Sequence, residues 1–100
     1  MLCHTGGPAV LRAIAAGLSI DEEHQLSASW DVMRAHGNLS GASNLAVLDA
    51  HVHAAEKNGG GTRGDASTST STTPQREWAL GLAMGPGICL EGVLLRKCSS

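Results

Sequence analysis

Two apolar runs near the end of the chain most constrain how it can fold. Residues 78–84 and 88–95 have the length of strands, and residues 85–87, with the sequence Gly-Pro-Gly, lie between them. Proline suits position i+1 of a tight turn and glycine position i+2, so the sequence predicts an antiparallel hairpin. Both runs are apolar on both faces, as in a central sheet covered by helices. A two-stranded ribbon is only marginally stable, so the hairpin is expected to need further strands that the sequence does not contain. Residues 1–3, at the other end of the chain, read like the last residues of a strand.

Three helices are expected between residues 1–3 and the hairpin. Pro8 opens the first at a position where its missing N–H costs nothing, and residues 9–16 continue it. Ser27 or Ser29 can cap the second helix. The third, over residues 44–55, is apolar almost all round, so we expect it to be buried.

A change of composition interrupts this pattern at residues 59–75. Glycines are followed there by alternating serine and threonine, with almost no apolar side chains. Such a segment cannot offset its ordering entropy, so it is predicted to be a flexible insert. A chain of 100 residues allows one domain at most.

Charge and cysteine content exclude several classes of function. The net charge is −2 with acids and bases scattered, so neither a nucleic-acid nor a membrane surface is indicated. No apolar run approaches the roughly 18 residues of a membrane span. Cys3, Cys89 and Cys98 show no paired spacing and read as reduced thiols of a cytoplasmic protein. His51 and His53 face different directions on a helix, and no metal site is expected.

Three signals stand in a fixed order along the chain. His4 is followed by Thr-Gly-Gly-Pro, Asn38 lies in the stretch Gly-Asn-Leu-Ser, and residues 85–87 form the Gly-Pro-Gly turn. Together they resemble the C-terminal part of the type III polyketide synthases, the chalcone and stilbene synthase family, over residues 1–58 and 76–96. The resemblance implies a partial thiolase-like α/β fold, with helices packed on an incomplete sheet that ends in the hairpin. The whole chain would then be a partial C-terminal domain of that family.

The same resemblance implies a site. In the family a cysteine nucleophile carries the growing chain, and His4 and Asn38 match the histidine and asparagine that complete the site. Their N–H groups can hold a thioester oxygen as it gains charge, and likewise the enolate formed when malonyl-CoA loses CO2. We therefore expect His4 and Asn38 to share one cleft. The substrate-binding residues implied by the resemblance are those of the turn: Met84, Gly85, Pro86 and Gly87. Acyl-CoA and malonyl-CoA are the implied partners of the intact enzyme, which needs no cofactor and forms a homodimer.

The chain departs from the family pattern in three ways. Ala83 and Met84 stand where the family loop usually carries Gly-Phe, and Thr5 stands where proline is common. The matching motifs also place the nucleophilic cysteine upstream of this sequence. Cys3 is a poor substitute, because neighbouring side chains on a strand point to opposite faces and His4 is its neighbour. The isolated chain is therefore expected to be inactive.

Two other interpretations are open at this point. A ketoacyl-acyl-carrier-protein synthase III would share the fold, the histidine and the asparagine. Gly6, Gly7 and the Gly-Pro-Gly turn favour the polyketide family over it. A rival of another class is a non-catalytic remnant or interaction module that binds a full-length relative.

Overall fold

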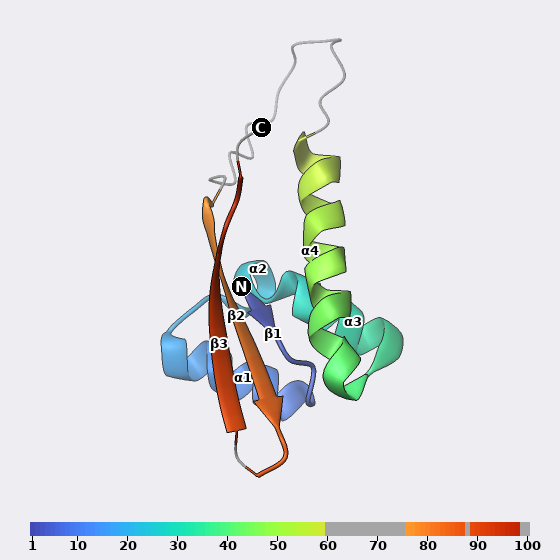
Figure 1. Cartoon of the computed structure of the whole chain (residues 1–100), viewed down its shortest axis with the longest axis vertical. Coiled ribbons are helices and arrows are strands. Elements are labelled where there is room, and N and C mark those ends of the chain that lie inside the picture. Colours follow the sequence, from blue (N-terminus) through green and yellow to red (C-terminus); the bar gives the residue numbers. More distant parts are fainter. Residues whose placement is uncertain (60–75, 88, 99–100) are drawn as a thin grey trace.

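A computed structural model describes residues 1–59, 76–87 and 89–98 (Figure 1). It combines helices with a three-stranded mixed sheet, which confirms the expected α/β class. In chain order the elements are β1 (Leu2–Cys3), α1 (Pro8–Leu18), α2 (Glu22–Gln25), α3 (Ser27–His36), a 3-10 turn (Ser40–Ala42), α4 (Ser43–Gly59), β2 (Trp78–Gly85) and β3 (Cys89–Arg96). No helix in these described ranges is long and apolar enough to cross a membrane.

The sheet joins the first residues of the chain to the hairpin at its end. Its strand order is β1-β2-β3, and β1 runs parallel to β2 with Leu2 opposite Gly81. The backbone N–H of His4 donates to the Leu82 carbonyl at 3.0 Å, which continues this pairing by one residue. β2 and β3 pair antiparallel along their whole length, so the predicted hairpin is confirmed. Gly87 has φ +82° in the connecting turn, a conformation that favours glycine.

The two residues of β1 belong to different parts of the core. Leu2 packs with residues of α3 and α4 that include Val32 and Val47. Cys3 packs with Leu11 of α1 and with other residues around α1 and α2. Successive side chains of a strand point to opposite faces, so this short strand connects two hydrophobic clusters. Figure 1 shows α4 standing beside the sheet and α1 lying close to its lower half.

The prediction that residues 44–55 form a buried helix is wrong in the described structure. Val47 is fully buried, but Leu45 of the same helix is 70% exposed. The expected covering of both faces of the sheet is also not found, since Leu94 on the edge strand β3 is 63% exposed. The cause in both cases is that α4 and β3 meet other described elements on one side only. An apolar composition indicates that a surface is to be buried, but it does not identify the element that buries it.

The end of α4 and the start of α3 differ from what the sequence predicts. α4 runs to Gly59, the first residue of the predicted flexible insert, and residues 60–75 lie outside the described residues. α3 follows α2 directly with Leu26 at the cap position, and no side chain caps its start. Ser29 is buried instead, and its Oγ accepts a hydrogen bond from the backbone N–H of Cys3 at 3.0 Å.

Candidate functional site

His4 and Asn38 line one open hollow of about 360 Å³. The expected shared cleft is therefore present, although one residue follows β1 and the other follows α3. The hollow is completed by Ser40, Gly41, Met84, Gly85 and Pro86. Three of the four residues assigned to substrate binding thus border it, whereas Gly87 is not among its lining residues. The catalytic and substrate-binding roles stay predictions.

Ser40 and Gly41 are the lining residues that sequence reasoning missed. Both belong to the loop that follows Asn38, and Ser40 has φ +54°, which few residues other than glycine adopt. Their nearness to Asn38 in the sequence was the signal that could have found them. An asparagine that forms a tight turn brings the next two or three residues to the same surface.

Asn38 is held in a tight turn at the end of α3. Gly37 ends the helix with φ +69°, and its N–H donates to the Met33 carbonyl at 2.9 Å. The Oδ1 atom of Asn38 then accepts a hydrogen bond from the backbone N–H of Ser40 at 2.8 Å. With its oxygen used in this way, the side chain has its NH2 group left to offer a ligand in the hollow. A structural role in a turn and a donor role in a site are therefore compatible in this residue.

The glycines after His4 have distinct roles. A Cβ atom placed on Gly6 would lie 3.3 Å from Cδ2 of the His4 ring, so a side chain at this position would crowd the ring. Gly7 precedes α1 with φ +153° and ψ +165°, a combination that residues with a side chain rarely adopt. The turn between His4 and α1 thus depends on both glycines.

We expect Gly7→Ala to destabilise the chain by about 1–3 kcal/mol, because alanine would be strained in this conformation. Chemical denaturation followed by circular dichroism would measure the change. Gly17→Ala is the matched control, since it lies in α1 with ordinary φ and open space around it. The control should be neutral or stabilising by about 0.5–1 kcal/mol. Equal effects of the two substitutions would contradict this role for Gly7.

Cys3 is unsuited to act as a nucleophile for this hollow. Its side chain lies in the core cluster with Leu11, and burial raises the pKa of its thiol. A nucleophilic cysteine needs the opposite shift, because the thiolate is the reactive form. Cys3 is also not among the residues that line the hollow of His4 and Asn38.

The other histidines that the sequence singled out lie on α4. His51 is half-buried, and burial lowers its pKa. His53 is exposed; its Nδ1 lies 2.9 Å from the Asp49 carbonyl oxygen, and this hydrogen bond raises its pKa. Within the described ranges no three histidine, cysteine or acidic residues are grouped in a way that could hold a metal ion.

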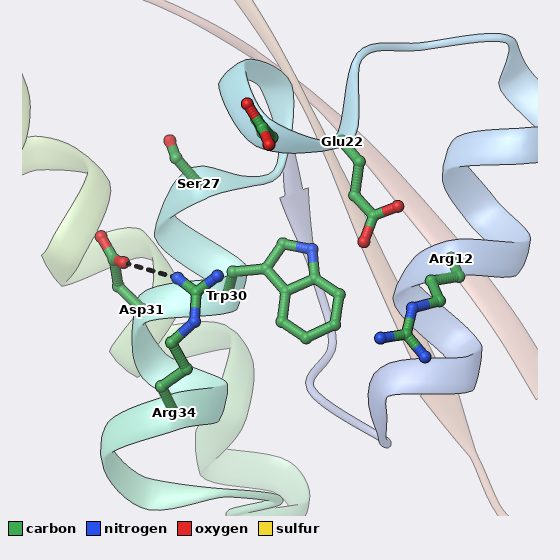
Figure 2. Close-up of a pocket in the computed structure, with 7 residues that line it drawn as sticks. Arg12, Glu22, Ser27, Trp30, Asp31 and Arg34 are labelled. Atoms are coloured by element: carbon green, nitrogen blue, oxygen red, sulfur yellow. Dashed lines mark hydrogen bonds and ion pairs between the residues drawn. The ribbon is translucent and has the colours of Figure 1, made fainter.

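A larger open hollow, of about 690 Å³, lies over α1, α2 and α3 (Figure 2). Its centre is the indole of Trp30, which Figure 2 shows between Arg12 and Arg34. The two guanidinium carbons lie 5.6 and 5.5 Å from a Trp30 ring centroid, and Arg34 also pairs with Asp31 at 3.5 Å. Each cation–π contact at an exposed site contributes about 0.5–1 kcal/mol. Its lining mixes acids and bases and contains no histidine or cysteine, so the smaller hollow that holds His4 and Asn38 is taken as the candidate site.

Comparison with known proteins identifies the family. The family model described as "Chalcone and stilbene synthases, C-terminal domain" matches residues 1–99. The chain is 39% identical over 95 residues to 1,3,6,8-tetrahydroxynaphthalene synthase of Streptomyces peucetius subsp. caesius, a match that covers 95% of this chain and 21% of that protein. It is 35% identical over 97 residues to type III polyketide synthase A of Arabidopsis thaliana, covering 97% of this chain and 21% of the relative.

A third relative, type III polyketide synthase C of Arabidopsis thaliana, is 36% identical over 94 residues, with 94% of this chain and 21% of the relative covered. The chain thus spans about a fifth of the length of these curated relatives. No solved structure matches it significantly. The family match runs through almost the whole sequence, including both segments that carry His4 and Asn38. The chain therefore belongs to the chalcone and stilbene synthase family of type III polyketide synthases, and it matches the C-terminal domain of that family.

Proposed function

We propose that this chain supplies the histidine and asparagine of a polyketide synthase site that condenses an acyl-CoA with malonyl-CoA. The observation that carries the proposal is the shared hollow of His4 and Asn38. His4 follows β1 and Asn38 follows α3, and the hydrogen bonds from Cys3 to Ser29 and from Thr5 to Gly37 hold the two segments together. Membership of the family supports the polyketide-forming part of the proposal.

The chemistry follows from the donors that the two residues offer. Loss of CO2 from malonyl-CoA breaks a carbon–carbon bond, and its electron pair becomes an enolate whose oxygen carries negative charge. A ring N–H of His4 and the NH2 group of Asn38 would donate to that oxygen. The enolate carbon then attacks the enzyme-bound thioester, whose thiolate leaves. One such donor in a water-excluded site contributes about 2.7–4 kcal/mol to stabilising the transition state.

Other parts of the reaction lie with groups outside these residues. The thiolate is assigned to a cysteine outside residues 1–100, because burial makes Cys3 unsuitable and the exposed Cys89 and Cys98 do not line the hollow of His4 and Asn38. The reaction uses CoA thioesters as substrates and no cofactor, and the assembled enzyme is a homodimer. Met84, half-buried at the end of β2, forms one wall of the hollow together with Gly85 and Pro86. A flexible thioether there adapts to more than one product shape, so we assign Met84 to substrate contact.

The test is a chimera in which this chain replaces the matched segment of the Streptomyces synthase. Labelled malonyl-CoA is supplied, and both released CO2 and a lengthened acyl product are measured. We expect turnover above that of a version in which the segment is deleted. The intact Streptomyces synthase serves as the control for the assay. A chimera that folds, as judged by circular dichroism and sedimentation, but releases no CO2 would overturn the proposal and favour a non-catalytic role.

A further inference from the structure

Buried hydroxyl groups surround the candidate site. Among the described residues, the buried polar side chains are those of Thr5, Ser29 and Ser43, each with 0% of its surface exposed. Each bonds to a backbone atom of a residue next to His4 or Asn38 in the sequence: Ser29 to Cys3, Thr5 to Gly37 and Ser43 to Leu39. A buried hydroxyl costs free energy unless it is bonded, so each bond is required where it occurs.

Two of these bonds attach α3 to the segment that carries His4. The Oγ of Ser29, near the start of α3, accepts from the backbone N–H of Cys3 at 3.0 Å. The Oγ1 of Thr5 donates to the carbonyl of Gly37, the residue that ends α3, at 3.1 Å. Cys3 and Thr5 are the immediate neighbours of His4. The residues on both sides of His4 are therefore bonded to α3 or to the glycine that caps it.

The third bond holds the turn of Asn38 from the other side. The Oγ of Ser43, at the start of α4, accepts from the backbone N–H of Leu39 at 2.9 Å. Gly37 and Leu39, the two neighbours of Asn38, are thus both bonded to buried hydroxyls. Thr5 differs from the other two, because its bond joins the His4 segment directly to the Asn38 turn.

We propose that Thr5, Ser29 and Ser43 form a hydroxyl frame that positions His4 relative to Asn38, with Thr5 as its central positioning residue. This role rests on the proposed function in one respect: positioning matters for the reaction because His4 and Asn38 act together on one oxygen. An error of about 1 Å in the placement of a catalytic group can cost roughly 100-fold in rate, so a rigid link between two donors has a direct chemical value.

The first test compares Thr5→Val with Thr5→Ser in the full chain. Valine keeps the shape of threonine and removes the hydroxyl, whereas serine keeps the hydroxyl. Hydrogen exchange with mass spectrometry reports on a peptide covering residues 37–43 and on peptides of the hairpin. Loss of one buried hydrogen bond should speed exchange in the turn about tenfold for Thr5→Val, with the hairpin unchanged. Thr5→Ser should restore the rate to within about twofold.

Controls separate positioning from general stability. Ser27→Ala removes an exposed hydroxyl of α3, which donates to the His24 carbonyl at 3.4 Å, and should leave the turn unchanged. If Thr5→Val unfolds the chain, Ser43→Ala gives the same measurement from the other side of the turn, with the same tenfold expectation. Unchanged exchange in the turn, or equal acceleration in the turn and the hairpin, would overturn the proposal.

A second readout addresses the reaction itself. In the chimera, Thr5→Val should lower kcat about tenfold with KM unchanged, and Thr5→Ser should restore kcat. The exchange experiment needs no substrate, so the two proposals can fail separately. An inactive chimera with a turn loosened by Thr5→Val would overturn the function and leave the frame standing. An active chimera whose kcat is insensitive to Thr5→Val would overturn the frame.

Discussion

In the active chimera, His4→Ala should lower the rate of CO2 release from malonyl-CoA by about 10²–10³-fold. The reason is that removing one donor from a preorganised oxyanion site typically costs this much in kcat. The effect should appear in kcat, because the donor acts on charge that develops during the reaction. His36→Ala is the matched control, since His36 is exposed at the end of α3 and does not line the hollow. A His4 variant with the rate of the control would contradict the assignment.

Asn38→Asp gives the sharper form of the same prediction. Aspartate keeps an oxygen that can accept from the Ser40 N–H, so the turn is preserved. It lacks the NH2 group and brings negative charge toward the enolate oxygen, so the rate should fall at least as far as in His4→Ala. The double variant should lose less than the product of the two single effects, because the two donors act on one oxygen. Near-normal activity of Asn38→Asp would assign Asn38 a purely structural role.

The hairpin could be predicted from the sequence because its determinants are local. Strand-length apolar runs and a Gly-Pro-Gly turn specify antiparallel pairing by themselves. The pairing of Leu2 with Gly81 joins residues from opposite ends of the chain; residues 1–3 read like a strand end, but no local signal indicates that they pair with the hairpin. The exposure of α4 could not be predicted, because an apolar composition does not say on how many sides a helix meets neighbours, and Leu45 lies where α4 meets none.

The candidate site was predictable in its two central residues and not in what holds them. His4 and Asn38 stand out through the residues that follow or precede them. In the sequence Thr5 stands out only as a departure from the family pattern, and Ser29 suits a helix cap. Both residues turn out to bond to distant backbone groups. A hydroxyl can cap a helix, close a turn or cross to another element, and sequence alone does not select the partner.

Residues 1–100 made alone should turn over no acyl-CoA. Condensation through a covalent thioester requires a thiolate beside His4 and Asn38. Burial raises the pKa of the Cys3 thiol, and the exposed Cys89 and Cys98 do not line the hollow. Removing the nucleophile from an enzyme of this chemistry typically lowers kcat by several orders of magnitude. Leu90 and Leu94 of β3 are 61% and 63% exposed, so the isolated chain should also associate, which sedimentation would detect. The assay is again CO2 release from labelled malonyl-CoA, beside the chimera as the positive control.

Variants of the isolated chain decide what any residual turnover would mean. Turnover that Cys3→Ala abolishes would show that the buried thiol becomes accessible and acts as the nucleophile. Turnover that survives Cys3→Ala but is lost in His4→Ala would indicate decarboxylation supported by the donors without a covalent intermediate. That second reaction would release CO2 and form no lengthened acyl product, because no thioester carbonyl is held in place to accept the enolate. Measuring both products on the same sample therefore separates a complete condensation site from the half that His4 and Asn38 can form.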